Sequence, residues 1–208
     1  MSDALELRLA GDHAYLVQLS DNAQVHHLAR AVRAMWPDQL AEVVPGHTTL
    51  LLVWHRERPS MDTVGASLKP IVIGDDPEAS DTAPPVCIPT HYDGADLVNV
   101  ATKLGVTVDE VVRLHSERVW TVAFMGFAPG FPYLIGGDPR LALPRLSTPR
   151  TAVPAGSVAV AAGYCGIYPR SSPGGWNLLG RTELVLFDAE RDPPALLAPG
   201  ARVRFEPL

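Results

Sequence analysis

The segment at residues 74–85 separates the chain into two parts, and no other feature constrains the fold more. Its sequence, GDDPEASDTAPP, is acidic and rich in proline, and it contains almost no large apolar side chain. Such a segment cannot bury enough apolar surface to form part of a hydrophobic core. We therefore predict one domain at residues 1–75, a linker at 76–85 and a second domain at 86–208.

The first part shows strand and helix periods in turn. Apolar residues alternate with polar ones at residues 5–9, and a second apolar run at 14–19 follows a Gly-Asp pair, which predicts two strands joined by a tight turn. Helical spacing then begins after Ser20-Asp21 and ends before a proline. The same order recurs, and its helix is predicted at 60–69. The pattern predicts a two-layer α+β domain of order β-β-α-β-β-α.

The second part begins with a predicted strand at residues 86–92 and two short helices. The first helix ends at Gly105, and the second starts with Thr107 and Glu110 spaced as a capping box, in which each side chain bonds the backbone N–H of the other residue. From Trp120 onward, short β-type runs alternate with glycine and proline. That pattern is typical of an all-β sandwich or barrel, so we predict a mainly-β second domain.

The composition limits the classes of function. With 47% apolar and 19% charged residues, the chain is expected to fold, and it has no apolar run near the roughly 18 residues of a membrane helix. Residues 1–10 lack the basic-then-apolar pattern of a signal peptide, so a cytoplasmic location is expected. The formal charge of −6 disfavours nucleic acid as a partner. The cysteines, Cys87 and Cys165, are expected to be reduced thiols, and no metal site is identified.

Two features suggest catalysis at first sight. The sequence GWNLLGRT at residues 175–182 is close to a phosphate-binding loop, but arginine replaces the lysine and bulky side chains fill positions that must be small. Residues 182–187 also predict a strand instead of the helix that such a loop requires, so we reject a nucleotide loop there. His115 lies on the apolar side of its predicted helix, which favours a buried core histidine over a catalytic one but leaves both open.

Proline–arginine pairs recur every five residues, at Arg140, Arg145 and Arg150. Each proline fixes its own backbone angle and extends the residue before it, so the arginines lie on a stiff chain. A guanidinium matches the oxygens of a carboxylate or phosphate in a two-pronged geometry. We therefore predict a small anionic ligand, with a plain basic surface loop as the alternative. The loop at residues 126–133, GFAPGFPY, adds three aromatic rings that either line a pocket or cap the core.

Five segments together resemble one known family. They are IPTHYDGADL at 88–97, GFAPGFPYL at 126–134, DPRLALPRLSTPRTAVPAGSV at 138–158, GIYPRSSPGGW at 166–176 and GRTELVLFD at 180–188. In this order they resemble the B subunit of 5-oxoprolinase, also called allophanate hydrolase subunit 1 or KipI-like. The resemblance implies a cyclophilin-like barrel for the second domain.

The activity implied by the resemblance is the ATP-dependent opening of 5-oxoproline to glutamate, carried out together with an A and a C subunit. ATP is then a co-substrate of the complex, and the isolated chain, which shows no nucleophile, metal or nucleotide motif, is expected to be inactive. Two alternatives stay open. One is a component of an allophanate hydrolase that acts on a urea-derived amide, and the other is an inhibitor that binds a sensor histidine kinase.

The resemblance also implies site residues without fixing the role of each one. The expected catalytic residues are Arg140, Arg145, Arg150 and His115, and the expected substrate-binding residues are Gly126, Phe127, Pro129, Gly130, Gly175, Trp176 and Arg181. One segment departs from the family: AAGYCG at 161–166 stands where the family reads roughly AGGQTG, so an amide and a hydroxyl are lost. This departure leaves the identity of the substrate open.

Overall fold

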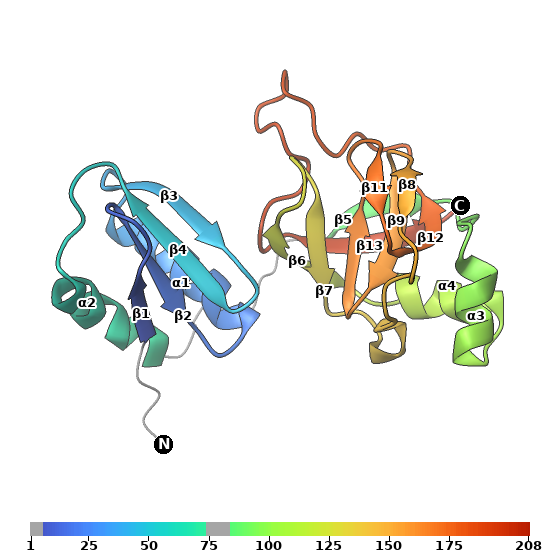
Figure 1. Cartoon of the computed structure of the whole chain (residues 1–208), viewed down its shortest axis with the longest axis horizontal. Helices are drawn as coiled ribbons and strands as arrows, with labels where there is room; N and C mark the ends of the chain where they lie inside the picture. The colour runs from blue at the N-terminus through green and yellow to red at the C-terminus, as the bar shows by residue number, and fades with distance from the viewer. Residues whose placement is uncertain (1–5, 74–83) are drawn as a thin grey trace. The chain divides into compact units, whose positions relative to one another are not determined.

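The computed structural model describes residues 6–73 and 84–208, and the chain divides into two compact units, Met1–Thr82 and Ala83–Leu208 (Figure 1). The division falls inside the linker predicted at residues 76–85. Only the last two residues of that linker belong to the described part of the chain, so the linker and its boundaries stay predictions. None of the described helices is long and apolar enough to cross a membrane.

The first unit is an antiparallel sheet of strand order β1-β2-β4-β3, and helix α1 contacts both the sheet and helix α2. Along the chain its elements are β1 (Glu6–Leu9), β2 (Ala14–Gln18), α1 (Asn22–Met35), β3 (Leu40–Pro45), β4 (Thr49–Trp54) and α2 (Met61–Ile73). The predicted β-β-α-β-β-α order and the two-layer α+β class are therefore confirmed.

Alternation along the two central strands builds the core of this unit. Tyr15 and Val17 from β2 and Leu50, Leu52 and Trp54 from β4 are all buried in one apolar cluster with the inner faces of both helices. Successive side chains of a strand point to opposite faces, so every second residue of each strand reaches the helices. The apolar period visible in the sequence therefore sets which face of the sheet is covered.

The helix ends of the first unit agree only in part with prediction. Asp21 caps α1 by accepting a hydrogen bond of 2.9 Å from a backbone N–H of the first turn. Helix α2, expected at residues 60–69, instead continues to Ile73 with Pro70 inside it. Proline removes one backbone donor, but its fixed φ suits a helix, and the buried Leu68 holds the preceding turn against the core.

The second unit is built on a seven-stranded sheet of order β12-β9-β10-β7-β6-β13-β5, in which only β13 and β5 pair in parallel. Strands β8 and β11 form a separate antiparallel pair. The elements are β5 (Val86–Thr90), α3 (Leu97–Leu104), α4 (Val108–Ser116), β6 (Trp120–Met125), β7 (Pro132–Ile135), the 3-10 helix η1 (Pro139–Leu141), β8 (Arg150–Val153), β9 (Ser157–Ala161), β10 (Tyr164–Ile167), β11 (Ser172–Gly174), β12 (Asn177–Arg181) and β13 (Arg202–Pro207).

Backbone hydrogen bonds between the two edge strands close this sheet into a barrel. His91 follows β5 and Arg181 ends β12, and these residues exchange two N–H···O bonds of 2.9 Å each. The Gly94 N–H adds a further link to the carbonyl of Leu179 at 3.0 Å. Gly94 has to be glycine, because a Cβ there would overlap the backbone of β12. The predicted mainly-β barrel is therefore confirmed.

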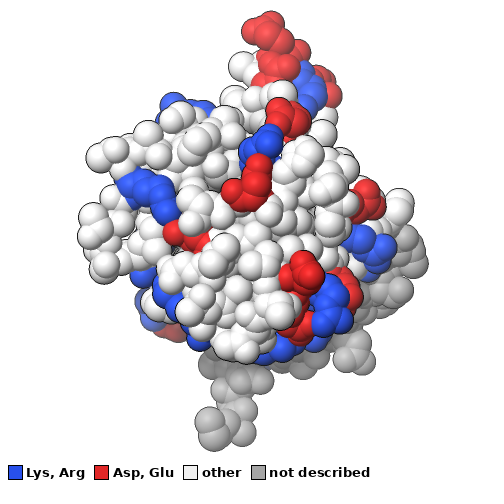
Figure 2. All heavy atoms as spheres, turned by 90° about the vertical axis from the view of Figure 1, so that its right-hand side faces the viewer, with Lys and Arg blue, Asp and Glu red and all other residues white. Residues whose placement is uncertain are grey.

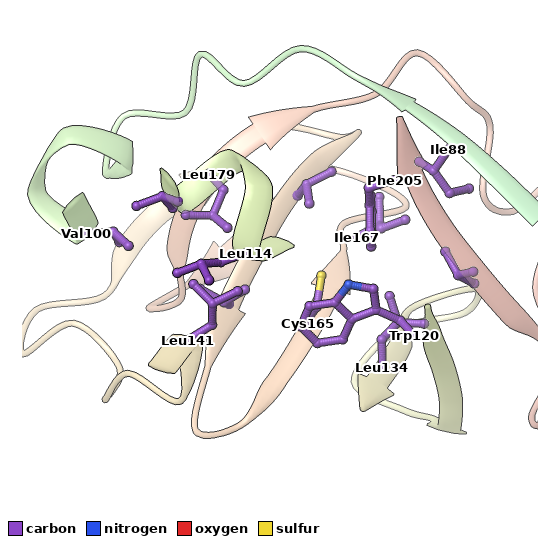
Figure 3. Packing of buried hydrophobic residues seen from close by; sticks show 14 of the residues in the cluster. Ile88, Val100, Leu114, Trp120, Leu134, Leu141, Cys165, Ile167, Leu179 and Phe205 are labelled. Atoms are coloured by element: carbon purple, nitrogen blue, oxygen red, sulfur yellow. The ribbon is translucent and has the colours of Figure 1, made fainter. Parts of the chain in front are cut away.

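Apolar side chains from every strand of the barrel fill its interior (Figure 3). On β9, Val158 and Val160 belong to this interior cluster, whereas Ala159 and Ala161 belong to a second, largely aromatic cluster on the other side of the strand. Helix α4 adds Leu114 to the interior. Strand β9 is thus buried on both faces, between the barrel core and an aromatic layer outside the barrel.

Two local predictions for the second unit need correction. Thr107 caps α4 by accepting from the Glu110 N–H at 3.2 Å, as expected, but the Glu110 side chain pairs with arginines instead of completing the capping box. Residues 182–187 form no regular strand, because Leu186 packs into the barrel core while its backbone leaves the sheet. Residues 175–182 do run into β12, in agreement with the rejection of a nucleotide loop.

Candidate functional site

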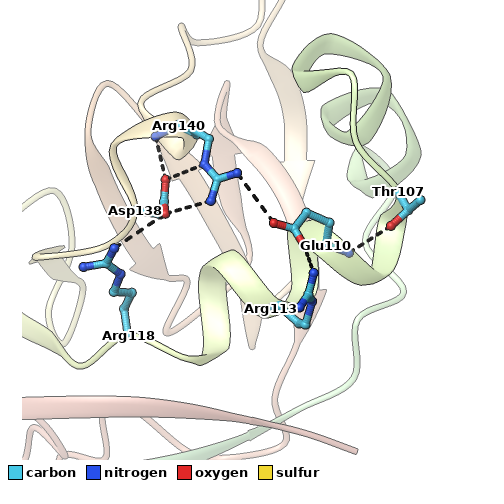
Figure 4. Close-up of polar contacts among 6 residues, drawn as sticks. All are labelled: Thr107, Glu110, Arg113, Arg118, Asp138 and Arg140. Atoms are coloured by element: carbon cyan, nitrogen blue, oxygen red, sulfur yellow. Dashed lines mark hydrogen bonds and ion pairs between the residues drawn. The ribbon is translucent and has the colours of Figure 1, made fainter.

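The structure places the predicted site residues in separate regions, and Arg140 belongs to a charged cluster on α4 and η1 (Figure 4). Its Nε and Nη2 donate to the Asp138 carboxylate at 3.0 and 3.1 Å, and its Nη1 lies 3.5 Å from a Glu110 oxygen. Arg113 and Arg118 pair with the same two carboxylates. Hydrogen bonds from Arg140 hold the pKa of Asp138 below its usual value. The Arg140 fork is therefore already occupied by acids.

Arg181 is paired in the same way at the exposed end of β12. Its Nε donates to Asp93 at 3.0 Å and its Nη1 donates to Glu183 at 2.9 Å. Figure 2 shows that charges on the pictured face lie as neighbouring acidic and basic groups, without a broad area of one sign. Exposed ion pairs of this kind contribute less than about 1 kcal/mol to stability. The guanidinium groups of Arg140 and Arg181 are thus both held by neighbouring carboxylates.

His115 lies inside the barrel, where α4 carries it into the apolar core with no exposed surface. Its Nδ1 is 2.7 Å from the hydroxyl of Tyr92 and its Nε2 is 3.2 Å from the sulfur of Cys165, while its ring packs 4.3 Å from that of Phe205. Burial lowers the pKa of His115 to about 3. The arrangement is that of a satisfied core histidine, so its catalytic role stays a prediction that burial disfavours.

The partners of His115 are neutral for the same reason. Burial raises the pKa of Cys165, and burial, with a smaller contribution from Cys165, raises the pKa of Tyr92. A neutral thiol is a poor nucleophile. The hydrogen-bonded row of Tyr92, His115 and Cys165 is therefore a neutral, buried group in the packing of the barrel interior.

The loop after β6 covers the outer face of the barrel with aromatic rings. Phe131 is buried and meets the rings of Tyr168 and Trp176 edge to face, with centroids 5.2 and 5.7 Å away. Phe127 extends this cluster outward: its ring contacts Phe131 at 5.3 Å but is 61% exposed. Its φ of 64° lies in the left-handed region that a bulky residue seldom adopts. An exposed ring on a strained backbone is a candidate ligand contact.

Glycines make room for these rings. A Cβ on Gly166 in β10 would lie 2.7 Å from a ring carbon of Phe131 and 3.0 Å from one of Trp176, so only glycine lets the aromatic layer lie on the strand. Gly130 has a φ of 77°, and a Cβ there would lie 2.5 Å from Phe187. The predicted substrate-binding residues Gly126, Phe127, Pro129 and Gly130 thus form one turn that is anchored by its glycines and presents Phe127 outward.

Arg145 lies beside this layer on a segment that is fixed on both sides. The Asn177 side chain donates to the carbonyl of Pro144 at 3.0 Å, and the Leu146 N–H donates to the carbonyl of Gly175 at 2.7 Å. The Arg145 side chain is exposed and makes no hydrogen bond or ion pair with a described residue. Because the backbone is already fixed, binding an anion would cost only the ordering of the Arg145 side chain itself.

Arg150, at the start of β8, is the second arginine at this place. Its Nη2 donates to the buried Asp96 at 2.8 Å, and the other oxygen of Asp96 accepts from the Leu178 N–H at 2.7 Å. The Nη1 of Arg150 is buried and has no partner among the described residues. Burial and the nearby Tyr133 raise the pKa of Tyr168, and the charges of both Arg145 and Arg150 oppose that rise, so both guanidinium groups lie within electrostatic range of its hydroxyl.

We call this group the arginine–aromatic site: it consists of Phe127, Phe131, Arg145, Arg150, Tyr168 and Trp176. The exposed, unpaired guanidinium of Arg145 and the positive charge of Arg150 suit a carboxylate or phosphate, and the exposed ring of Phe127 suits a flat apolar body. No cluster of three or more acidic, histidine or cysteine residues that could hold a metal occurs in the described residues. The site is thus equipped to bind and orient an anion.

The residues missed by sequence reasoning are Tyr168, at the centre of the site, and Asp96, which orients Arg150. Both lie in segments singled out for the resemblance, GIYPRSSPGGW and IPTHYDGADL. The presence of polar residues in these two segments was therefore the sequence signal that could have identified Tyr168 and Asp96 as site residues. Asn177, which holds the Arg145 segment, lies between Trp176 and the rest of β12 and had no such signal.

Comparison with known proteins agrees with the resemblance seen in the sequence. Residues 5–197 match the family described as carboxyltransferase domain, subdomain C and D. The chain belongs to this family. The matched region includes the arginine–aromatic site and most of both units.

Two relatives carry the same name, that of the 5-oxoprolinase B subunit. The chain is 34% identical over 225 residues to the protein of Bacillus subtilis (strain 168), in an alignment that covers 99% of this chain and 93% of that relative. It is 50% identical over 123 residues to the protein of Escherichia coli O157:H7, in an alignment that covers 58% of this chain and 56% of that relative. The match to the second relative thus spans about half of its length. The resemblance to the family of 5-oxoprolinase B subunits is confirmed.

Solved structures show the same fold. The crystal structure of TTHA0988 superposes with a TM-score of 0.79 at 37% identity, and the match covers 98% of this chain and 40% of that chain. The urea amidolyase of Kluyveromyces lactis superposes with a TM-score of 0.67 at 19% identity, and the match covers 100% of this chain and 15% of that chain. At that low identity, the second likeness concerns the fold alone.

Proposed function

We propose that this chain is the B subunit of a 5-oxoprolinase, which converts 5-oxo-L-proline, ATP and water to L-glutamate, ADP and phosphate. The observation that carries the proposal is the match with the B subunit of Bacillus subtilis, at 34% identity over 99% of this chain and 93% of that relative. A match of that extent includes both units, so it concerns the whole chain and not one shared domain.

The arginine–aromatic site supports this substrate class. 5-Oxoproline carries one carboxylate on a small, nearly flat lactam ring. Arg145 offers a free two-pronged donor to the carboxylate, and the buried Nη1 of Arg150 offers a further donor. The exposed Phe127 ring offers an apolar surface to the lactam. A phosphorylated intermediate would also find its negative charge opposite these two arginines.

The chemistry explains why this chain needs partners. A lactam carbonyl is a poor electrophile, but transfer of a phosphoryl group from ATP to its oxygen activates the carbonyl carbon. Water then adds to this carbon, the ring C–N bond breaks to leave a free amine and an acyl phosphate, and a second water hydrolyses the acyl phosphate to glutamate and phosphate. The described residues of the site offer hydrogen-bond donors that can hold a negative charge. They include no nucleotide-binding loop and no reactive thiol. We therefore assign substrate positioning to this chain and the binding of ATP, the co-substrate, to the A or the C subunit. The isolated chain is expected to be inactive.

The test is an ATP-coupled glutamate-release assay on the chain mixed with its A and C subunits. Glutamate release is expected only when all three are present, and stoichiometric phosphate release should accompany it. A complex that assembles but turns over allophanate in place of 5-oxoproline would assign the other substrate. Assembly without turnover of either compound, together with inhibition of a sensor histidine kinase by the chain, would overturn the enzymatic proposal.

A further inference from the structure

A second candidate site lies in the first unit, apart from the arginine–aromatic site. A cavity of about 340 Å³ lies between the turn after α1 and the segment after β4. Its lining includes Trp54 with Asp38, His55, Arg56 and Glu57. This volume is in the range of sites that bind small molecules, about 300 Å³ and above.

Backbone contacts hold the walls of this cavity in place. The His55 N–H donates to the carbonyl of Gln39 at 3.0 Å, which ties the segment after β4 to the turn after α1. The Trp54 N–H donates to the carbonyl of His13 at 2.8 Å, and the His13 ring is 2.9 Å from the carbonyl of Arg56. The cavity is therefore pre-formed, so a ligand would not have to order a mobile loop.

Buried donors without partners among the described residues accompany the cavity. Trp54 is only 4% exposed, and its Nε1 has no hydrogen-bond partner there. The Nε of Arg58, four residues further along, is also buried without a partner. Both side chains pack on Tyr15, whose ring lies 5.7 Å from that of Trp54 and 4.8 Å from the guanidinium carbon of Arg58. Buried donors in folded proteins are nearly always bonded, so these two indicate an acceptor beyond the described residues, and of the two only Trp54 lines the cavity.

The charges on the cavity wall decide which kind of acceptor fits. Asp38 and Glu57 are carboxylates, whereas Arg56 is a guanidinium, so both signs line the same space. A ligand with only a negative charge would be repelled by the carboxylates of Asp38 and Glu57. A ligand with only a positive charge would leave the Trp54 N–H without an acceptor. A molecule that carries both charges satisfies each group.

We propose that this cavity binds a free α-amino acid. Its carboxylate accepts hydrogen bonds from Trp54 Nε1 and Arg56, and its ammonium group lies near Asp38 and Glu57. The side chain of the amino acid extends to the open side of the cavity. The site is independent of the proposed 5-oxoprolinase activity, since it uses residues of the first unit only.

The experiment is an NMR titration of the full-length chain with ¹⁵N-labelled tryptophan. The Trp54 indole N–H signal is assigned by its loss in Trp54→Phe, and the chain is then titrated with L-glutamate, L-lysine and L-alanine, and separately with acetate and methylamine. A saturable shift of the Trp54 signal is expected with at least one amino acid and with neither single-charge compound. No saturable shift with any amino acid, or an equal response to acetate, would overturn the proposal.

Variants with intact cores complete the test. Arg56→Ala and the double change Asp38→Asn with Glu57→Gln alter exposed side chains, so each should weaken the binding of the amino acid about tenfold or more without changing the rest of the spectrum. Arg8→Ala is the matched control, because Arg8 is exposed on β1 at the opposite edge of the sheet from β3. Unchanged affinity in the Arg56 variant would refute the assigned carboxylate contact and, with it, the proposal.

Discussion

Mild acid should destabilise the barrel through His115. Burial lowers the pKa of this residue in the folded state to about 3, whereas an unfolded chain has the ordinary value of about 6.5. As the pH falls below the unfolded-state pKa, His115 binds a proton in the unfolded state but stays neutral in the folded state. The free energy of unfolding therefore decreases between the two pKa values. Linkage then gives a loss of about 2 kcal/mol between pH 6.5 and 4.5 from this residue alone.

The assay is urea unfolding followed by ¹⁹F NMR of the chain labelled with 5-fluorotryptophan. Trp120 and Trp176 lie in the second unit, so their separate signals report the unfolding of the barrel. The His115→Gln variant can donate and accept hydrogen bonds but does not titrate. Carboxylates titrate in both proteins and cancel in the comparison. We expect the wild type to lose about 2 kcal/mol more of its free energy of unfolding than the variant over this pH range.

The control for the first prediction is His91→Gln, which changes a histidine at the barrel seam and should keep the wild-type pH dependence. Equal losses of stability in the wild type and in His115→Gln would refute the reasoning. Such a result would mean that the folded barrel protonates His115 without cost, which is incompatible with a ring enclosed between Tyr92 and Cys165.

Three further predictions concern the outer face of the barrel. Gly166→Ala should lower the free energy of unfolding, measured by thermal unfolding, by about 1–3 kcal/mol, because its Cβ would lie 2.7 Å from a ring carbon of Phe131. Gly175→Ala is the control: its Cβ would make an ordinary contact of 3.5 Å, so the loss should be less than about 0.5 kcal/mol. Asp96→Asn should lower the free energy of unfolding in urea by about 2 kcal/mol. This is less than the loss expected on breaking a fully buried ion pair, because Arg150, the partner of Asp96, is partly exposed. In the assembled complex, Arg145→Lys should lower kcat/KM about tenfold, whereas Arg140→Lys should leave it nearly unchanged. Equal activity of these two variants would contradict the assignment of the unpaired Arg145 guanidinium as the group that binds the anion.

The elements of the fold could be predicted where their signals are local. Asp21 and Thr107 cap their helices by bonds to residues three positions away, and Gly105 ends α3 in the left-handed conformation with a φ of 67°. Each of these devices is complete within one turn of chain, so the sequence displays all of it. The alternation that buries Leu50 and Leu52 is equally local.

Predictions failed where a local pattern had a distant competitor. Residues 182–187 alternate like a strand, yet the sheet has no free edge for them, since the seam between His91 and Arg181 closes the barrel. The Glu110 side chain was expected to complete a capping box, but Arg140 and Arg113 offer it ion pairs instead. The barrel seam and Arg140 come from parts of the chain that the local pattern does not include, whereas Arg113 lies three residues further along the same helix.

The sequence by itself determined the order of helices and strands in the first unit, the mainly-β character of the second and the family, because these depend on periods, caps and motifs that are read along the chain. The tertiary structure decided which arginine is available to a ligand. Identical proline–arginine spacing made Arg140, Arg145 and Arg150 equivalent in the sequence, but folding pairs the first with nearby acids and the third with Asp96, 54 residues away, and leaves only Arg145 without a bond among the described residues. Pairing of charges depends on distance in space, which local spacing does not encode.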